Sequence, residues 1–402
     1  MMAMSRQAVR QGASLNRVPR LDYLLLLTTI ALASLGLVMV ASASITLADR
    51  DLGQPFYFAI RQAIYVGIGV LLALPVYRVR LALLEQAGPV LLVAALALLL
   101  AVLIPGVGRE VNGSMRWINA GLFNLQVSEP AKLMILVYLA GYLARRGEEL
   151  RERLSGFLKP MVVLTLAALL LMMEPDFGAT VVLMATAMGM IFLAGVRLAH
   201  FSGMLGLAGL SLAALAVSSP YRMERLTTFL NPWADPFDSG FQLTQSLIAI
   251  GRGELTGVGL GASIQKLFYL PEAHTDFVFA VLAEELGLFG VFVVMALYAV
   301  LVWRAFAIAQ QAEKSGNVFA ASLAHGIGIW IGLQSFINMG VNMGLLPTKG
   351  LTLPLMSYGG SSMVIMCVAI ALLLRIDSET RCTLDGLSAS GVAPATRRRS
   401  MA

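Results

Sequence analysis

The sequence predicts an all-α, polytopic membrane protein with about ten transmembrane helices. Of its 402 residues, 58% are hydrophobic and only 13% are charged, whereas soluble domains carry roughly 45–50% apolar and about 25% charged residues. The mean hydropathy is +0.79, and the apolar residues form long runs bounded by charge, the pattern of membrane-spanning helices. Short segments of alternating polarity, typical of a membrane β-barrel, do not occur. The same figures exclude intrinsic disorder, collagen and disulfide-stapled scaffolds.

Ten apolar runs follow one another along the chain, each with edges good to about four residues. Their content of Leu, Ala, Gly and Met suits helices that pack closely in lipid. A cleaved signal peptide at the first run is disfavoured, because that run is long and nine more follow. The runs lie near residues 22–43, 57–76, 88–105, 127–144, 158–173, 178–196, 201–218, 277–303, 319–345 and 355–375.

The basic residues predict the orientation of the chain in the membrane. An even number of spans places both termini on one side, and if that side is cytoplasmic, 19 of the 29 basic residues lie in inner segments. The positive-inside rule therefore predicts an N-in, C-in topology. We expect a membrane domain over 21–376 and disordered cytoplasmic tails at 1–20 and 377–402. Cys367 and Cys382, in the last span and the inner tail, are expected to be reduced thiols.

Two outer segments, 106–126 and 219–276, are long enough to carry a functional site, and we expect the second to be the large catalytic loop. Apolar residues at helical spacing over 243–250 predict an amphipathic helix lying on the outer leaflet. A helix packed on the bundle is an equally good interpretation. Ser239 and Gln242 have the spacing of a capping box at the start of this helix.

Ionisable residues gather at the outer ends of several spans. Such residues are costly in a membrane and are functional candidates by default, although a single one is more often a structural ion pair or a helix cap. Glu129 and Lys132 lie three residues apart and can pair, and Asp276 could cap the eighth span. Several on one face predict a polar cavity that opens outward. Further members are Glu174, Asp176, Glu284, Glu285, Lys349 and Ser357.

Other chemistries find no support in the sequence. His200, His274 and His325 are scattered, so a histidine metal site is disfavoured. The glycine-rich stretch 257–261 follows no strand and lacks a full phosphate-binding pattern, which favours a hinge or a re-entrant turn. No Ser/His/Asp motif and no basic aromatic module for nucleic acid occur.

Six motifs follow one another along the chain. They are Asn112-Gly-Ser-Met-Arg116-Trp117-Ile, Ser128-Glu129 with Lys132, Glu174-Pro-Asp-Phe-Gly178, Pro271-Glu-Ala-His-Thr-Asp276-Phe277, Ala283-Glu-Glu-Leu-Gly287 and Leu353-Pro-Leu-Met-Ser-Tyr-Gly-Gly-Ser-Ser362. In this order they resemble the SEDS family (shape, elongation, division and sporulation), which polymerises peptidoglycan from lipid II, and the likeness spans about 20–376. The stretches 229–236, 265–271 and 346–352 are similar to the division branch, FtsW, rather than to the RodA elongation branch. One departure is the segment 125–130, where proline follows Glu129 instead of preceding the Ser-Glu pair.

The resemblance implies an inverting glycosyltransferase that releases undecaprenyl diphosphate. Asp276 matches the family's essential aspartate and is the candidate general base for the attacking 4-hydroxyl. The leaving diphosphate needs a cation, either a basic side chain or a divalent ion such as Mg²⁺ or Mn²⁺. The cationic candidates are Arg116, Lys132, Arg222 and Lys349, with Lys132 alternatively held by Glu129. The other candidates for contact with the substrate are Glu129, Glu174, Asp176, His274 and Ser357.

The resemblance also implies partners and a location. The expected partners are lipid II, membrane lipid, a class B penicillin-binding protein and other division proteins, with no nucleic acid. The expected location is the bacterial inner membrane at the division septum, with the active site on the periplasmic face. Two alternatives stay open at this point, a lipid II transporter (flippase) and a scaffold for other division proteins. Transporters usually show internal repeats and midplane sites, and the sequence shows neither.

Overall fold

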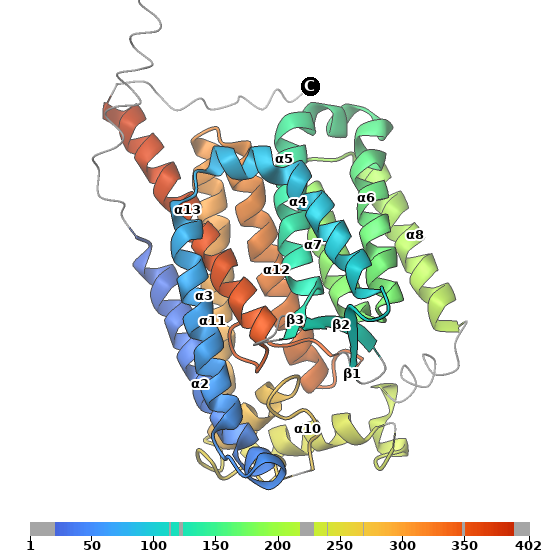
Figure 1. Cartoon of the computed structure of the whole chain (residues 1–402), viewed down its shortest axis with the longest axis vertical. Helices are drawn as coiled ribbons and strands as arrows, with labels where there is room; N and C mark the ends of the chain where they lie inside the picture. The colour runs from blue at the N-terminus through green and yellow to red at the C-terminus, as the bar shows by residue number, and fades with distance from the viewer. Residues whose placement is uncertain are drawn as a thin grey trace, which may run out of the picture.

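Ten long helices form the body of the molecule, and each coincides with one of the predicted spans (Figure 1). The computed structural model describes residues 21–111, 114–119, 124–217, 229–238, 240–267, 269–347 and 350–389. The helices are α2 (Tyr23–Leu52), α3 (Tyr57–Arg78), α4 (Leu81–Val102), α5 (Ser128–Glu152), α6 (Leu154–Met173), α7 (Phe177–Leu193), α8 (Leu198–Val217), α11 (Val278–Lys314), α12 (Val318–Asn342) and α13 (Gly360–Ala389).

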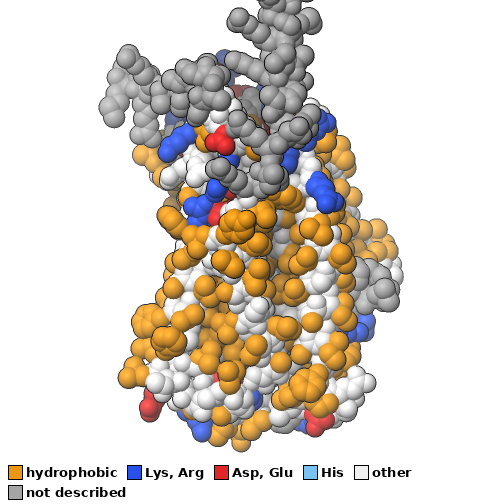
Figure 2. Space-filling view, turned by 90° about the vertical axis from the view of Figure 1, so that its left-hand side faces the viewer, with side chains coloured by type: hydrophobic (Ala, Val, Ile, Leu, Met, Phe, Trp, Pro, Cys, Tyr) orange, Lys and Arg blue, Asp and Glu red, His pale blue; other side chains and the backbone are white. Residues whose placement is uncertain are grey.

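The fold class predicted from the sequence is confirmed. Within the described residues, seven helices are long and apolar enough to cross a membrane, namely α2, α3, α4, α6, α11, α12 and α13. That α5, α7 and α8 also cross, giving ten spans, stays a prediction, as does the N-in, C-in topology. Figure 2 shows hydrophobic side chains over the middle of one face, with Lys and Arg mainly toward its upper end. A belt of this kind is what a lipid-solvated bundle requires.

Helix α12 lies at the centre of the bundle and packs against α11, α5 and α7. Its large side chains Phe319 and Trp330 are buried. Its glycines allow close approach, since a Cβ placed on Gly328 would lie 2.9 Å from the Cβ of Ala305 on α11. Small residues at such contacts are how helices associate in lipid, where the hydrophobic effect does not drive them together. The polar groups on α12 are therefore held in fixed positions.

A small sheet and a surface helix cover the end of the bundle at which α2 ends (Figure 1). Three antiparallel strands, in the order β1-β2-β3, lie at this end, and the sheet adds to the all-α prediction. Strand β3 is joined to α13, because the Gln126 amide donates to Ser361 Oγ at 2.8 Å. The bounds are Gly108–Val111 for β1, Ser114–Asn119 for β2, Asn124–Gln126 for β3 and Phe241–Gly253 for the surface helix α10, with a short 3₁₀ turn at Pro232–Ala234.

Helix α10 packs on the bundle, which agrees with one of the two interpretations of the apolar spacing over 243–250. It lies against α11, and Ser246 Oγ donates to the carbonyl of Asn342 on α12 at 2.8 Å. The capping box is wrong: the helix begins at Phe241 with Gly240 at the N-cap and no side-chain cap. Ser239 itself lies outside the described residues.

Two helices run further than predicted. Helix α13 continues to Ala389, so the domain boundary predicted at residue 376 falls inside a helix. Arg381 and Asp377 pair there at 2.8 Å. Helix α11 extends to Lys314, and its Arg304 pairs with Asp22, the N-cap of α2. Charged pairs prolong both helices beyond their apolar spans. The disordered tail predicted at 377–402 is therefore wrong over 377–389, which is helical, while residues 1–20 and 390–402 lie outside the described residues. Both cysteines are free thiols.

Candidate active site

Asp276 lies directly before α11, at the end of the molecule covered by the sheet and α10. It does not cap the helix, because Phe277 occupies the N-cap position and no side chain caps there. Its backbone carbonyl accepts hydrogen bonds from Asn338 Nδ2 at 2.9 Å and Asn342 Nδ2 at 3.0 Å. A Cβ placed on Gly350 would lie 3.1 Å from the Asp276 Oδ2 atom. The main chain is thus fixed by α12 while the carboxylate faces the backbone at Gly350.

The charge state of Asp276 is set by burial. Burial raises the pKa of Asp276 from its ordinary value of 3.8 to about 7. The Glu272 and Asp176 carboxylates add to the rise, and the Arg116 guanidinium opposes it. A general base works best when its pKa lies near the working pH. The structure therefore places at position 276 a carboxyl group that can accept a proton near neutral pH.

Arg116 on β2 reaches the turn between α6 and α7. Its Nε donates to the carbonyl of Glu174 at 3.2 Å, and its Nη2 donates to the carbonyl of Pro175. Neutral carbonyls leave the positive charge of the guanidinium uncancelled. The same charge lowers the pKa of Asp276 and of Glu174, so Arg116 is the cation that acts on both carboxyl groups.

Glu174 and Asp176 occupy this turn in different ways. Glu174 is fully buried, and neither of its carboxylate oxygens has a hydrogen-bond partner among the described residues. Burial, with a smaller contribution from Asp176, raises the pKa of Glu174 to about 8 against the opposing effect of Arg116. Asp176 caps α7 by accepting from the Ala179 amide at 3.1 Å. A pKa near 8 favours the protonated form of Glu174 at neutral pH, and Asp176 caps α7 through Oδ1 while its buried Oδ2 has no partner among the described residues.

Glu129 and Lys132 form the ion pair that their spacing predicted, so the shifted proline, Pro130 in the first turn of α5, does not break it. The Lys132 Nζ and Glu129 Oε1 atoms are 2.9 Å apart, and both side chains are buried. Lys132 also donates to Gln334 Oε1 at 3.3 Å and lies 5.0 Å from the centre of the Trp330 ring. Held by these three groups in the bundle interior, Lys132 has little freedom to follow a diphosphate.

His274 and Ser357 support the segment around Asp276. The His274 ring packs between Phe58 and Tyr358, with ring centres 4.6 and 5.5 Å away, and burial lowers its pKa. The Tyr358 amide donates to the His274 carbonyl at 2.9 Å. Ser357 Oγ accepts from the Leu353 amide at 2.8 Å, which closes a turn. The structure brings both residues near the site as packing and turn residues.

Three amide side chains on α12 were missed from the sequence. Asn338 Nδ2 donates to the carbonyls of Asp276 and Leu351, and Gln334 Nε2 donates to that of Thr352 at 2.9 Å. These bonds join the strand-like segment at 350–353 to the start of α11. A signal existed, because Gln334, Asn338 and Asn342 recur every four residues along an apolar span.

Some candidates cannot be placed. Arg222 and Lys349 lie outside the described residues. Among the residues that the structure describes, no three His, Cys, Asp or Glu side chains gather closely enough to hold a metal ion. Mg²⁺ is often bound through only one or two carboxylates together with substrate phosphates, so a divalent ion stays a candidate beside the basic side chains.

Glu284 and Glu285, eight and nine residues after Asp276, belong to a separate structure. Glu284 Oε atoms accept from Ser263 Oγ and from the Ile264 and Gln265 amides. Glu285 pairs with Lys266 at 2.7 Å. Both glutamates are fully buried. We call this set, Lys266 with Glu284 and Glu285, the loop clip, because it holds the segment after α10 on α11.

Glycines make the loop clip possible. Gly257, at φ +80°, lies so close to α11 that a Cβ there would be 2.2 Å from the Glu285 carbonyl oxygen. Gly287, at φ +65°, breaks the helix opposite it. The Leu288 and Phe289 amides freed by this break donate to the carbonyls of Glu254 and Leu255 at 2.9 and 3.2 Å. The glycine-rich stretch 257–261 is thus a turn that packs on the helix break at Gly287.

A comparison with known sequences decides the family. A profile of the FtsW/RodA/SpoVE family, described as "Cell cycle protein", matches residues 22–382. The chain belongs to the FtsW/RodA/SpoVE family. Its resemblance to the SEDS proteins and to their division branch is thereby confirmed.

Members of the FtsW/RodA/SpoVE family align with nearly the whole chain. A relative from Thioalkalivibrio sulfidiphilus (strain HL-EbGR7) is 61% identical over 94% of this chain and 96% of its own length. A relative from Nitrosococcus halophilus (strain Nc4) is 59% identical over 94% of this chain and 96% of its own length. Both bear the name "Probable peptidoglycan glycosyltransferase FtsW".

Solved structures of the FtsW/RodA/SpoVE fold agree with the helical arrangement. One, described as "Structural coordination of polymerization and crosslinking by a peptidoglycan synthase complex", matches with a TM-score of 0.75 and 30% identity over 90% of this chain and 98% of that chain. The Rod shape determining protein RodA of Thermus thermophilus matches with a TM-score of 0.66 and 28% identity over 89% and 96%.

Proposed function

We propose that this protein is a peptidoglycan glycosyltransferase that polymerises lipid II into glycan strands and releases undecaprenyl diphosphate. The observation that carries the proposal is the 61% identity, over almost the entire chain, to a relative that bears the name of this activity. The surroundings of Asp276 support it independently, because they provide a proton acceptor and a cation at one end of a membrane bundle.

Asp276 serves as the general base in this proposal. The 4-hydroxyl oxygen of one disaccharide unit attacks the anomeric carbon of a lipid-linked sugar, and its proton passes to the Asp276 carboxylate. The bond from the anomeric carbon to the diphosphate oxygen breaks, and its electron pair leaves on that oxygen. A single displacement inverts the configuration of the anomeric carbon. A positioned base contributes typically about 10²–10⁴ in rate.

Arg116 is the cation we assign to the leaving diphosphate. Its charge is not cancelled by the two backbone carbonyls that hold it, and it acts on Asp276 and Glu174. Lys132 is poorly suited because Glu129 and Gln334 hold it inside the bundle. Arg222 and Lys349 stay as candidates from the sequence. A bond to developing negative charge is worth about 2.7–4 kcal/mol in well-ordered sites.

The membrane setting follows from the same proposal. We place the chain in the bacterial inner membrane at the division septum, with the Asp276 end on the periplasmic face, where the sugars of lipid II lie. A class B penicillin-binding protein is the proposed partner, since this enzyme forms glycan and does not crosslink peptides. A related structure described as a peptidoglycan synthase complex supports a partnership of polymerisation with crosslinking. Other division proteins and membrane lipid complete the expected contacts.

The test uses purified protein in detergent with lipid II, which separates polymerisation from transport because detergent offers no two compartments. We expect glycan chains to form, with the penicillin-binding partner present if it is needed. Repeated failure to form glycan with that partner present would favour a transporter. A parallel reaction with a chelator tests the divalent ion, and unchanged polymerisation is expected if Arg116 alone stabilises the diphosphate.

A further inference from the structure

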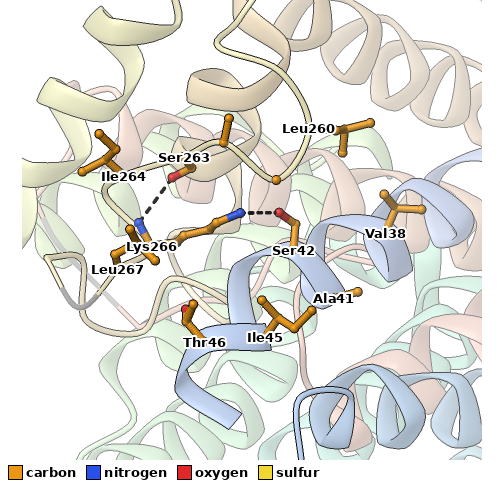
Figure 3. Close-up of a pocket in the computed structure, with 12 residues that line it drawn as sticks. Val38, Ala41, Ser42, Ile45, Thr46, Leu260, Ser263, Ile264, Lys266 and Leu267 are labelled. Atoms are coloured by element: carbon orange, nitrogen blue, oxygen red, sulfur yellow. Dashed lines mark hydrogen bonds between the residues drawn. The ribbon is translucent and has the colours of Figure 1, made fainter. Parts of the chain in front are cut away.

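A cavity of about 610 Å³ lies between α2 and the loop that follows α10. One wall is the outer part of α2, from Val38 to Thr46, and the other is the segment from Leu260 to Leu267. Figure 3 shows these side chains on the two walls, with Lys266 extending across to Ser42. Volumes of roughly 300–1,000 Å³ are typical of ligand sites. The cavity is separate from the Asp276 site, none of whose residues line it.

The charged groups at its wall already satisfy one another, while the buried Thr46 Oγ1 has no hydrogen-bond partner among the described residues. The Lys266 Nζ donates to Ser42 Oγ at 2.9 Å and to Glu285 Oε1 at 2.7 Å. Ser42 Oγ lies at 2.7 Å from the same Glu285 oxygen. Lys266 is nearly fully buried and Glu285 fully so. A paired lysine offers no free charge to an ionic ligand, so the rest of the lining, which is mostly Ala, Ile, Leu and Val, decides what enters.

The rim of the cavity is apolar and exposed. Val38 is 47% exposed and Leu260 is 60% exposed, while Ile264 and Leu267 on the loop are 38% and 39% exposed. Exposed apolar side chains around a hollow would be unfavourable in water. Against lipid the same exposure is favourable, and this is the setting that the proposal below assigns to the rim.

The lipid-facing stripe of α2 runs directly into the cavity. Leu27, Ile30 and Val38 are exposed along one face of the helix. The same face, at steps of three and four residues, continues as Ala41 and Ile45, which line the cavity. These steps place side chains one above the other on a helix. A hydrocarbon chain that lies along the exposed stripe therefore continues, without turning, beneath the loop.

The depth of the cavity fits one leaflet. From Val38 to Thr46 the helix rises by about 12 Å at 1.5 Å per residue, and the charged pair Asp51 and Arg50 marks the polar end of α2 just beyond. Half of a bilayer core is about 15 Å. The wall thus spans most of the hydrocarbon depth of the outer leaflet.

We propose that this cavity binds a single hydrocarbon chain of an outer-leaflet lipid, held between α2 and the 260–267 loop. The chain fills the hollow and contacts Leu260, Ile264 and Leu267 on the side of the loop. Because the loop clip joins this loop to α11, a bound chain also steadies the segment that leads to Asp276. The occupant is the acyl chain of a phospholipid, because a wall of about 12 Å matches a chain that is confined to one leaflet.

The test measures lipid binding rather than activity, so its outcome is independent of the proposed function. The full-length protein is placed in nanodiscs with a trace of phospholipid that carries a photoreactive group in its acyl chain, and labelled peptides are identified by mass spectrometry. Labelling is expected within 38–46 and 260–267. Ala41→Trp fills the cavity and should reduce labelling of 260–267 about tenfold, the contribution of burying about two methylene groups.

Ala31→Trp is the matched control, because Ala31 is exposed on the same stripe but outside the cavity. This variant should keep wild-type labelling of 260–267. Ala262→Trp fills the cavity from the opposite wall and should repeat the loss, which guards against misfolding of one variant. A second arm replaces the probe with a photoreactive polyprenyl phosphate, and stronger labelling of 260–267 by that probe would contradict the assignment to a phospholipid. The proposal would be overturned if residues 260–267 were labelled by both probes and neither Ala41→Trp nor Ala262→Trp reduced that labelling. It would also be overturned if neither probe labelled these residues.

Discussion

Two pairs of acids, Glu284 with Glu285 and Asp276 with Glu174, have very different surroundings. Glu284 and Glu285 in the loop clip are fully buried, and each accepts several hydrogen bonds and pairs with a cation. Glu174 is also fully buried and Asp276 is half-buried, and their pKa values are raised to about 8 and about 7. The Glu174 oxygens have no hydrogen-bond partner among the described residues.

The difference separates structural from chemical carboxyl groups. A buried charge is normally paired because an unpaired one is strongly destabilising. The loop clip follows this rule and holds α10, α11 and α2 together. The Asp276 region departs from it, and such departures concentrate at functional sites. The charge of Asp276 is therefore available to a substrate, whereas that of Glu285 is fully used by Lys266.

The largest expected effect is on Asp276. Asp276→Asn removes the proton acceptor, and polymerisation of lipid II should fall by about 10²–10⁴. Thermal unfolding at pH 8 should be unchanged or shifted upward, because the folded protein raises the pKa of this carboxyl group and so holds its charged form unfavourably. Asp51→Asn, at an exposed carboxylate on the outer end of α2, is the control and should keep wild-type polymerisation.

Breaking the loop clip tests whether its buried Lys266–Glu285 ion pair stabilises the fold. Glu285→Gln leaves the Lys266 ammonium buried without its counter-charge, which should cost about 3–5 kcal/mol of stability. A lower thermal unfolding midpoint in detergent checks this expectation. The double variant Lys266→Met with Glu285→Met should recover much of the loss, since no buried charge then lacks a partner. A single variant as stable as the wild type would show that the clip is not structural.

Arg116→Lys sharpens the assignment of the cation. Lysine keeps the charge but cannot donate to the Glu174 and Pro175 carbonyls in the same fork, so it is less well positioned. We expect polymerisation to fall about tenfold, close to half the value of an ordered charge-stabilising bond. Polymerisation by the Arg116→Gln variant should fall further, because glutamine carries no charge. Equal activity of the three proteins at saturating lipid II would remove Arg116 from the mechanism.

The smallest effect is expected at Glu174. Because its pKa is raised to about 8, this group is already neutral at pH 7, and Glu174→Gln preserves both shape and charge. Polymerisation at pH 7 should stay within about threefold of the wild type, a change of less than 1 kcal/mol. A loss as large as that of Asp276→Asn would assign the proton acceptor to Glu174 instead.

Apolar patterning predicted the helices well, because the requirement for about twenty lipid-soluble residues is written locally in the chain. The Glu129–Lys132 pair was also predicted from local information, because residues three apart lie on the same face of a helix. Other contacts join distant segments. Arg116 donates a hydrogen bond to Glu174, 58 residues away, and Asn338 donates one to Asp276, 62 residues away. No periodicity encodes such contacts. The role of Asp276 came from resemblance, since sequence spacing left a helix cap open.

The pH dependence of kcat/KM for lipid II tests the central claim most directly. With Asp276 as the base, only its deprotonated form works, and its pKa is raised to about 7. The value of kcat/KM should therefore increase about tenfold per pH unit below this pKa and level off above it. The account predicts a midpoint near pH 7. A profile that is already level from pH 5 upward would contradict it.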